Sequence, residues 1–143
     1  MAVEKVDPPV SPEEAAAKSN ELVKDAVRPV VLLVEDEALI RMVVVEMIEE
    51  LGYTALEAAS GEEALNILEH NGAVDVMVSD LGLPGLSGEQ LALQVRSRWP
   101  QIAIVFATGS NEAPSLDDPT RTAMLGKPFN EDALGKVLSN LLG

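Results

Sequence analysis

Short apolar runs alternate with longer segments of helically spaced apolar residues from residue 30 to the end of the chain. The run VVLLV at 30–34 is continuous and rich in β-branched residues, which is typical of a strand buried on both faces. Beyond it, apolar residues recur at helical spacing up to Leu51, and Gly52 is placed to end that helix. The alternation then continues, with strands predicted at 53–58, 74–79, 102–106 and 123–125 and helices predicted after Ser60, at 89–99 and at 130–142.

This alternation predicts an α/β protein with a parallel sheet. Strands that are apolar on both faces need helices on both sides of the sheet, and the crossovers between parallel strands supply them. Ligands of such proteins bind outside the carboxyl ends of the strands, where the strand order reverses. Polar residues at those ends are therefore the first candidates for a functional site.

The first part of the chain has a different character. We predict that residues 1–28 form a flexible N-terminal extension ahead of a domain at 29–143. Within the extension, Ser11 is a plausible N-cap and Pro12 suits the first helical position, which favours a helix at 12–27. Its apolar face is thin, so this helix is marginal unless a partner covers it.

The net charge of −14 narrows the range of partners. Nucleic acid and anionic membranes repel a chain this acidic, so cations and basic protein surfaces are the expected partners. No apolar segment reaches the roughly 18 residues that span a bilayer, and the N-terminus lacks the apolar core of a secretion signal. A cytoplasmic protein that binds neither nucleic acid nor membrane is expected. With no cysteine in the sequence, disulfides, thiolate metal sites and cysteine catalysis are excluded.

Polar residues with useful chemistry follow four of the predicted strands. Each has an ordinary explanation by itself, as a helix cap, a turn former or a solvated lysine. Their joint occurrence at one edge of a parallel sheet is far less expected by chance, and it predicts a site there. They are Glu35 and Asp36 after the first strand, Asp80 after the third, Thr108 after the fourth and Lys127 after the fifth.

Three carboxylates in one pocket repel one another, and a hard divalent cation relieves that repulsion. A set of oxygen ligands without histidine or cysteine favours Mg²⁺ or Mn²⁺ over zinc. We predict that Asp36 and Asp80 bind the cation directly, that the carbonyl of Gly82 is a third ligand, and that Glu35 acts through water.

The other two residues extend this site from a cation to a phosphate. Lys127 supplies a fixed positive charge, and Thr108 supplies a hydroxyl that can donate a hydrogen bond. Carboxylates can act as phosphoryl-accepting nucleophiles, and such transfer depends mainly on positioning and charge neutralisation. The arrangement therefore predicts a receptor for a phosphoryl group on Asp80.

The loop after Asp80 is rich in glycine and contains a proline that stiffens it. Its expected task is to hold the Gly82 carbonyl on the metal and to begin the next helix. We expect backbone conformations that are closed to other residues at Gly82, Gly85 and Gly88.

Four motifs in order, VLLVEDE, VSDLGLPGLSG, FATG and GKPF, resemble the receiver domain of bacterial two-component response regulators. The resemblance covers about residues 29–143. It implies a flavodoxin-like fold with five helices and five parallel strands in the order 2-1-3-4-5. It also implies a sensor histidine kinase or phosphotransfer protein as donor and a downstream protein target. Such a chain catalyses only its own phosphorylation and dephosphorylation, so it is not an enzyme in the usual sense.

The resemblance assigns roles to individual residues. It implies a cis peptide bond between Lys127 and Pro128. The family's functional positions are matched by Asp80 as phosphoacceptor, Glu35 and Asp36 as acidic pair, Thr108 as switch hydroxyl and Lys127 as the lysine that contacts phosphate.

Several positions depart from the family pattern. Met124 stands three places before Lys127, where the family usually has an aromatic switch residue. Gly82 stands where a side chain often limits the access of water to the acyl phosphate. The segment between Thr108 and Lys127 is short and holds prolines, so a reduced fourth helix is expected. The sequence FATGS resembles a subgroup with a Phe-Ala-Thr-Gly signature that also lacks the aromatic switch.

The expected mode of action is that of a stand-alone receiver, which binds other proteins as a monomer or weak dimer. Phosphate on Asp80 should draw in Thr108 and Lys127 and shift the segment 109–121. Two alternatives stay open. One is a constitutive protein-binding module with vestigial phosphorylation, favoured by Met124. The other is a Mg²⁺-dependent phosphatase, disfavoured because such enzymes usually carry an acid/base carboxylate two residues after the nucleophile.

Overall fold

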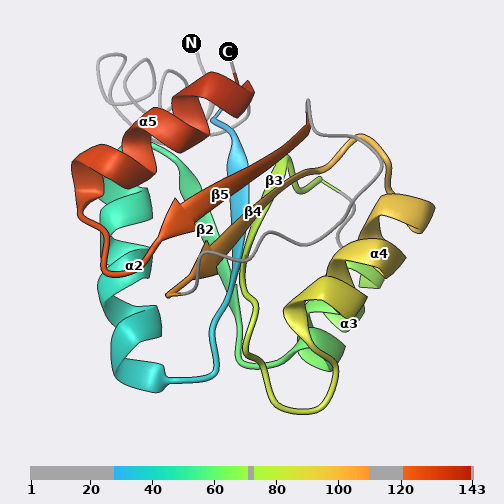
Figure 1. Ribbon diagram of the computed structural model, residues 1–143. Coiled ribbons are helices and arrows are strands. Elements are labelled where there is room, and N and C mark those ends of the chain that lie inside the picture. Colours follow the sequence, from blue (N-terminus) through green and yellow to red (C-terminus); the bar gives the residue numbers. More distant parts are fainter. Residues whose placement is uncertain (1–27, 71–72, 110–120, 143) are drawn as a thin grey trace, which may run out of the picture.

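A computed structural model describes residues 28–70, 73–109 and 121–142. At its centre is a five-stranded parallel sheet in the order β2-β1-β3-β4-β5, as the resemblance implied (Figure 1). The strands are β1 (Val30–Val34), β2 (Thr54–Ala58), β3 (Val76–Asp80), β4 (Ala103–Thr108) and β5 (Thr122–Gly126). The helices in the described residues are α2 (Ala38–Glu50), α3 (Gly61–His70), α4 (Gly88–Arg98) and α5 (Glu131–Leu142).

The strands follow their predicted positions to within two residues. The differences matter at β3 and β4, because Asp80 and Thr108 are the last residues of these strands rather than the first residues beyond them. Asp80 pairs with Ala107 of the neighbouring strand, and Thr108 pairs with Gly126. Both functional candidates are therefore fixed by the strand pairing itself and not by a loop.

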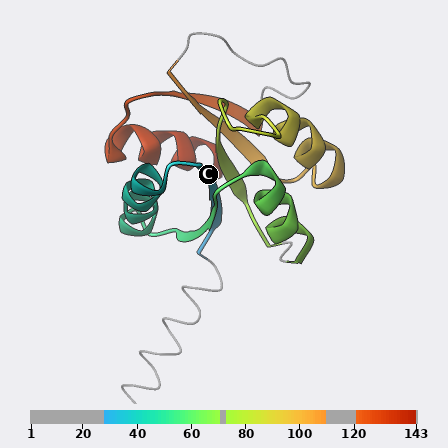
Figure 2. The same ribbon diagram turned by 90° about the horizontal axis from the view of Figure 1, so that it is seen from below.

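Alternate residues of each strand point to opposite faces of the sheet, and each face has its own core. Figure 2 shows α2 and α5 on one side of the sheet and α3 and α4 on the other. The side chains of Leu32, Met77 and Phe106 face α3 and α4 and are fully buried. Val31 and Val78, one residue earlier or later, belong instead to the core beneath α2 and α5. This two-sided burial explains why the strands read as continuous apolar runs.

Local chemistry marks the end of α2 and the beginnings of α3 and α5. Gly52 adopts a φ of 98° after α2, a conformation that side-chain-bearing residues rarely adopt. The Ser60 hydroxyl accepts a hydrogen bond from the Glu63 amide at 3.0 Å, and the Asn130 side chain accepts one from the Ala133 amide at 2.9 Å. These caps satisfy amide groups that have no partner within the helix.

Some predictions fall outside the described residues. They are the N-terminal extension with its helix at 12–27 and most of the segment at 109–121, where a reduced fourth helix was expected. Among residues 28–70, 73–109 and 121–142, no helix combines the length and apolar character needed to cross a bilayer.

Candidate functional site

The parallel sheet brings four separate parts of the chain to one edge. Glu35 directly follows β1, Asp80 ends β3, Thr108 ends β4, and Lys127 directly follows β5. The Lys127 amide donates a hydrogen bond to the Thr108 carbonyl at 2.8 Å, which continues the pairing of β4 and β5 beyond the last strand residue. The predicted convergence of these residues is therefore present.

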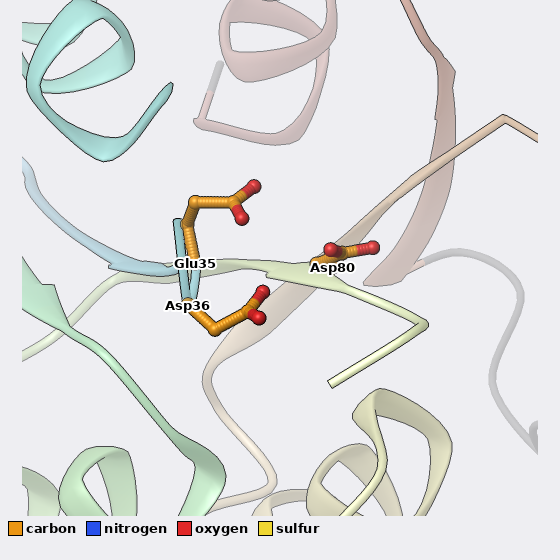
Figure 3. Close-up of side chains that lie close together, drawn as sticks. All are labelled: Glu35, Asp36 and Asp80. Atoms are coloured by element: carbon orange, nitrogen blue, oxygen red, sulfur yellow. The ribbon is translucent and has the colours of Figure 1, made fainter. Parts of the chain in front are cut away.

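Three carboxylates form the centre of the site. Glu35, Asp36 and Asp80 each place an oxygen within 4.8 Å of the others. Figure 3 shows Glu35 and Asp36 leaving the end of β1 with their carboxylates on the side of Asp80. Glu35 is buried, Asp80 is half-buried and Asp36 is exposed, so the cluster opens to solvent on the side of Asp36.

Lys127 supplies the positive charge that the sequence predicted for this site. Its ammonium lies 3.2 Å from Asp80 Oδ2 and 3.5 Å from Glu35 Oε1. The peptide bond to Pro128 is cis, as the resemblance implied. One fixed cation thus bridges two of the three carboxylates, and it neutralises only part of their combined charge.

Burial changes the acidity of one member of the cluster. The loss of water around Glu35 raises the pKa of its carboxyl above the ordinary 4.5, and the charge of nearby Asp80 adds to the rise. The Glu37 amide, which donates to Glu35 Oε2 at 3.1 Å, lowers the pKa, and the Lys127 ammonium also lowers it. The net pKa is raised because desolvation is the largest of these effects.

The loop after β3 fixes the orientation of the Asp80 carboxylate. The Gly82 amide donates a hydrogen bond to Asp80 Oδ1 at 3.1 Å, while Oδ2 faces the lysine. Of the three glycines expected to adopt special conformations, Gly85 does so, with a φ of 72°. The expectation is wrong for Gly82 and Gly88, which have ordinary φ values.

Gly88 is needed for a different reason. A Cβ atom at this position would lie 2.2 Å from the Asp80 carbonyl oxygen and 2.8 Å from Leu81 Cα. The start of α4 therefore packs directly against the backbone of the phosphoacceptor candidate. Ser87 caps this helix through a reciprocal pair of hydrogen bonds with Gln90, each 3.1 Å long. The loop is thus anchored at both ends.

Thr108 occupies the place that the sequence predicted. It is the last residue of β4 and only 7% exposed. Asp80 pairs with Ala107, the residue before Thr108. Thr108 therefore lies one position beyond Asp80 in the strand direction, at the same edge of the sheet. The strand pairing accounts for its position but does not by itself define a role for the hydroxyl.

Arg41 on α2 is a feature of this region that the sequence reasoning missed. Its Nη1 atom donates a hydrogen bond to the Glu35 carbonyl at 2.8 Å, and its Nε atom donates to Glu57 Oε1 on β2 at 3.0 Å. The helical spacing places Arg41 near the start of α2, but only the fold shows that Glu57 and the Glu35 carbonyl lie within its reach.

An apolar groove beside the site was also missed. It has a volume of about 590 Å³ and lies between α2 and the segment that follows β5. Leu39 is 77% exposed and Val43 is 50% exposed. The signal in the sequence was an α2 segment with more apolar residues than one buried face requires. The groove is lined by Leu39, Ile40, Val43, Val44, Met47, Lys127, Pro128 and Phe129.

The donor set of the site fits a hard divalent cation. The oxygens of Glu35, Asp36 and Asp80 are close enough to share one ion, and carboxylate oxygens are the ligands that Mg²⁺ and Mn²⁺ prefer. Asp80 is also the carboxylate nearest to Lys127. A nucleophilic oxygen next to a fixed ammonium is suited to receive an anionic group.

Comparison with known proteins identifies the family to which this chain is similar. The model of the response regulator receiver domain matches residues 31–139. The sensor kinase CckA of Brucella abortus is 37% identical over 139 residues, which cover 94% of this chain and 14% of that protein. The positive alginate biosynthesis regulatory protein of Pseudomonas aeruginosa is 33% identical over 112 residues, which cover 76% of this chain and 45% of that protein. The chain thus spans a small part of the first of these relatives and less than half of the second.

Solved structures give the same result. The receiver domain of the hybrid histidine kinase CckA is 34% identical, with a TM-score of 0.67 over 78% of this chain and 98% of that one. The response regulator protein TrrA of Thermotoga maritima, in complex with Mg²⁺-BeF, is 30% identical, with a TM-score of 0.70 over 79% of this chain and 98% of that one. The chain therefore belongs to the response regulator receiver domain family of two-component signalling.

Proposed function

We propose that this chain is a phosphorylatable receiver in which Asp80 accepts a phosphoryl group from a histidine of a sensor kinase or phosphotransfer protein. The observation that carries the proposal is the position of Asp80, whose carboxylate lies 3.2 Å from the Lys127 ammonium and within 4.8 Å of two further carboxylates. The signal would pass to a downstream protein through a changed surface.

The proposed reaction is a transfer between two nucleophiles. An oxygen of Asp80 attacks the phosphorus of the phosphohistidine, the phosphorus–nitrogen bond breaks, and its electron pair returns to the imidazole of the donor. The product is an acyl phosphate on Asp80. Dephosphorylation is a separate step: water attacks the same phosphorus, the bond between phosphorus and the Asp80 oxygen breaks, and inorganic phosphate leaves the regenerated carboxylate. Gly82 places no side chain in the way of that water. The chain acts on itself and returns to its starting state, so we do not class it as an enzyme.

The chain's own residues supply most of what this reaction requires. Asp36 and Asp80, with the Gly82 carbonyl and with Glu35 through water, would hold a Mg²⁺ or Mn²⁺ ion. When bound, that ion neutralises the phosphoryl oxygens and the carboxylates around them. The Lys127 ammonium, which contacts the Asp80 carboxylate, would form an ion pair with an oxygen of the phosphoryl group once that group is attached to Asp80.

Thr108 completes the proposed site as a switch. Its hydroxyl would donate a hydrogen bond to a phosphoryl oxygen, and this extra contact would favour one of two arrangements of the end of β4. Support for phosphate chemistry comes from the Thermotoga relative, which was crystallised with Mg²⁺-BeF. Beryllium fluoride is a mimic of a phosphoryl group.

The expected partners follow from charge and family. A net charge of −14 disfavours nucleic acid and favours proteins with basic surfaces, so we propose signalling by protein–protein contact in the cytoplasm. We expect the chain to be a monomer or weak dimer.

The test uses a small phosphoryl donor, so that no partner has to be known. The full chain is incubated with acetyl phosphate and Mg²⁺, and intact mass is measured. We expect one added phosphoryl group on the wild type and on Asp132→Asn, which changes an exposed carboxylate on α5. Asp80→Asn should remain unmodified. Modification of Asp80→Asn to the wild-type level would refute the acceptor assignment.

A second candidate function is a binding module that no longer depends on phosphate. It is favoured by Met124, which is 37% exposed on the edge strand β5 in the place of the usual aromatic switch. A module of this kind should bind its partner protein equally well with and without phosphate on Asp80. A pull-down in both states measures this, and a difference in partner affinity between them would exclude it.

A further inference from the structure

The Arg41 side chain donates two hydrogen bonds that connect three parts of the chain. From α2 its Nη1 atom donates to the Glu35 carbonyl oxygen at 2.8 Å, and its Nε atom donates to Glu57 Oε1 at 3.0 Å. Its side chain is 20% exposed, whereas that of Glu57 is 54% exposed. The guanidinium is therefore largely covered and held from two sides, unlike a surface arginine paired only through solvent.

The carbonyl that Arg41 holds belongs to the peptide between two of the site's carboxylates. A peptide unit is planar, so a fixed carbonyl oxygen also fixes the amide of the next residue and the direction in which its Cα leaves. That next residue is Asp36. On its other side, the Glu35 amide donates to the Ala58 carbonyl of β2 at 3.0 Å. The backbone of the acidic pair is thus held by β2 at one end and by Arg41 at the other.

The side chain of Glu35 is tied to the same turn. Its Oε2 accepts a hydrogen bond from the Glu37 amide at 3.1 Å, while its Oε1 lies 3.5 Å from Lys127. A rotation of the peptide between Glu35 and Asp36 would therefore move both carboxylates relative to Asp80. The Arg41 guanidinium holds this peptide through a hydrogen bond from a charged donor. Such bonds are stronger than bonds between neutral groups.

We infer that Arg41 is a positioning residue for the acidic pair: by holding the Glu35 carbonyl it sets the direction of the Glu35 and Asp36 carboxylates and so the affinity of the site for a divalent cation. Glu57 supports it by fixing the orientation of the guanidinium. The inference rests on the proposed function, because it assumes that these carboxylates bind Mg²⁺.

Charge and geometry predict opposite results when Arg41 is changed. A guanidinium near the site repels a divalent cation, so the loss of its charge alone would strengthen Mg²⁺ binding. The loss of its grip on the backbone would weaken binding. Arg41→Lys separates the two effects, because lysine keeps the positive charge but lacks the planar fork that serves two acceptors at once.

The experiment measures Mg²⁺ binding to the full chain by calorimetry. We expect Arg41→Lys to weaken Mg²⁺ binding about tenfold, in the range typical of residues that orient metal ligands. Glu57→Gln, which keeps Arg41, should weaken it by less. The matched control is Arg98→Lys, because Arg98 makes an ion pair of the same length, 3.0 Å, with Glu69 far from the site. It should bind Mg²⁺ like the wild type.

Two further measurements separate positioning from a general loss of stability. In the metal-free protein, Arg41→Lys should shift the amide resonances of residues 35–37, whereas Arg98→Lys should not. The rate of labelling by acetyl phosphate should return toward the wild-type value at saturating Mg²⁺. Unchanged Mg²⁺ affinity and unchanged amide shifts at 35–37 in Arg41→Lys would overturn the inference. A wild-type chain that binds no Mg²⁺ would overturn the proposed function and this inference together.

Discussion

The ammonium of Lys127 lies 3.2 Å from Asp80 Oδ2, although Asp80 ends β3, Lys127 directly follows β5, and β4 lies between these two strands in the sheet. The same ammonium is 3.5 Å from Glu35 Oε1. The lysine therefore neutralises part of the carboxylate charge that a divalent cation at this site would also neutralise. A bound cation would add positive charge next to the Lys127 ammonium, and a phosphoryl group on Asp80 would add negative charge there.

This competition predicts the result of removing the lysine charge. Lys127→Met should strengthen Mg²⁺ binding several-fold, because an ammonium no longer neutralises the same carboxylate oxygens. The same variant should lose the amide shifts at Thr108 and Gly109 that beryllium fluoride induces in the wild type. Calorimetry and a two-dimensional amide spectrum measure the two effects. Lys136→Met, on α5, is the control and should behave like the wild type in both; weaker Mg²⁺ binding by Lys127→Met would contradict the prediction.

The buried carboxyl of Glu35 predicts a pH dependence of stability. Because burial raises its pKa in the folded state above the ordinary 4.5, the folded chain binds a proton here that the unfolded chain has already lost. The contribution of Glu35 to stability is therefore fully present below pH 4.5 and is lost as the pH rises through the raised pKa. Glu35→Gln should increase the free energy of unfolding at pH 7, and the increase should disappear toward pH 4.

Thermal unfolding at a series of pH values measures this difference, with Asp132→Asn as a control on an exposed carboxylate. The same substitution should weaken Mg²⁺ binding at neutral pH, since a ligand charge is removed. A Glu35→Gln protein that is less stable than the wild type at pH 7 and equally stable at pH 4 would show that the carboxylate is favoured in the folded state, against the prediction.

The main features of the fold could be predicted from sequence for a physical reason. Strands covered by helices on both sides must be apolar throughout, so VVLLV at 30–34 identified β1 without knowledge of its neighbours. Parallel strands all end at one edge, which allowed Asp80 and Lys127 to be placed in one site despite their separation in sequence. Periodicity and topology were sufficient for these two conclusions.

The rest depended on contacts that no periodicity encodes. Arg41 reaches the Glu35 carbonyl only because α2 packs beside β2, where Glu57 fixes the guanidinium. The expectation for Gly88 was wrong in its reason: its φ is ordinary, and the lack of a side chain matters because the backbone of Asp80 lies against it. Close approaches of this kind appear only when two elements are placed in space.

Gly88 gives a direct prediction about the loop that carries Asp80. In Gly88→Ala the new methyl group would lie 2.2 Å from the Asp80 carbonyl oxygen, so the backbone has to move. We expect a loss of about 1–3 kcal/mol in the free energy of unfolding, as for other overpacked sites, together with weaker Mg²⁺ binding. Gly126→Ala is the control, since a Cβ there meets no atom within 4 Å. Denaturant unfolding compares the two; equal stability would show that the loop yields without cost.

The apolar groove beside Lys127 leads to a prediction about how the phosphoryl donor docks. A mutation in the groove should slow transfer from a protein donor but not from a small donor. Val43 is 50% exposed and lines the groove, and Leu93 is 52% exposed on α4, on the opposite side of the sheet. A protein donor must bury part of the surface around Asp80 to bring its histidine within reach, whereas acetyl phosphate needs only the site itself. Val43→Asp should therefore slow transfer from a phosphorylated histidine kinase about tenfold, a typical cost at the centre of an interface, and leave labelling by acetyl phosphate unchanged. Leu93→Asp should change neither rate. Equal slowing with both donors would place the effect of Val43→Asp in the site rather than in docking, and no slowing with the kinase would mean that the donor approaches Asp80 over another surface.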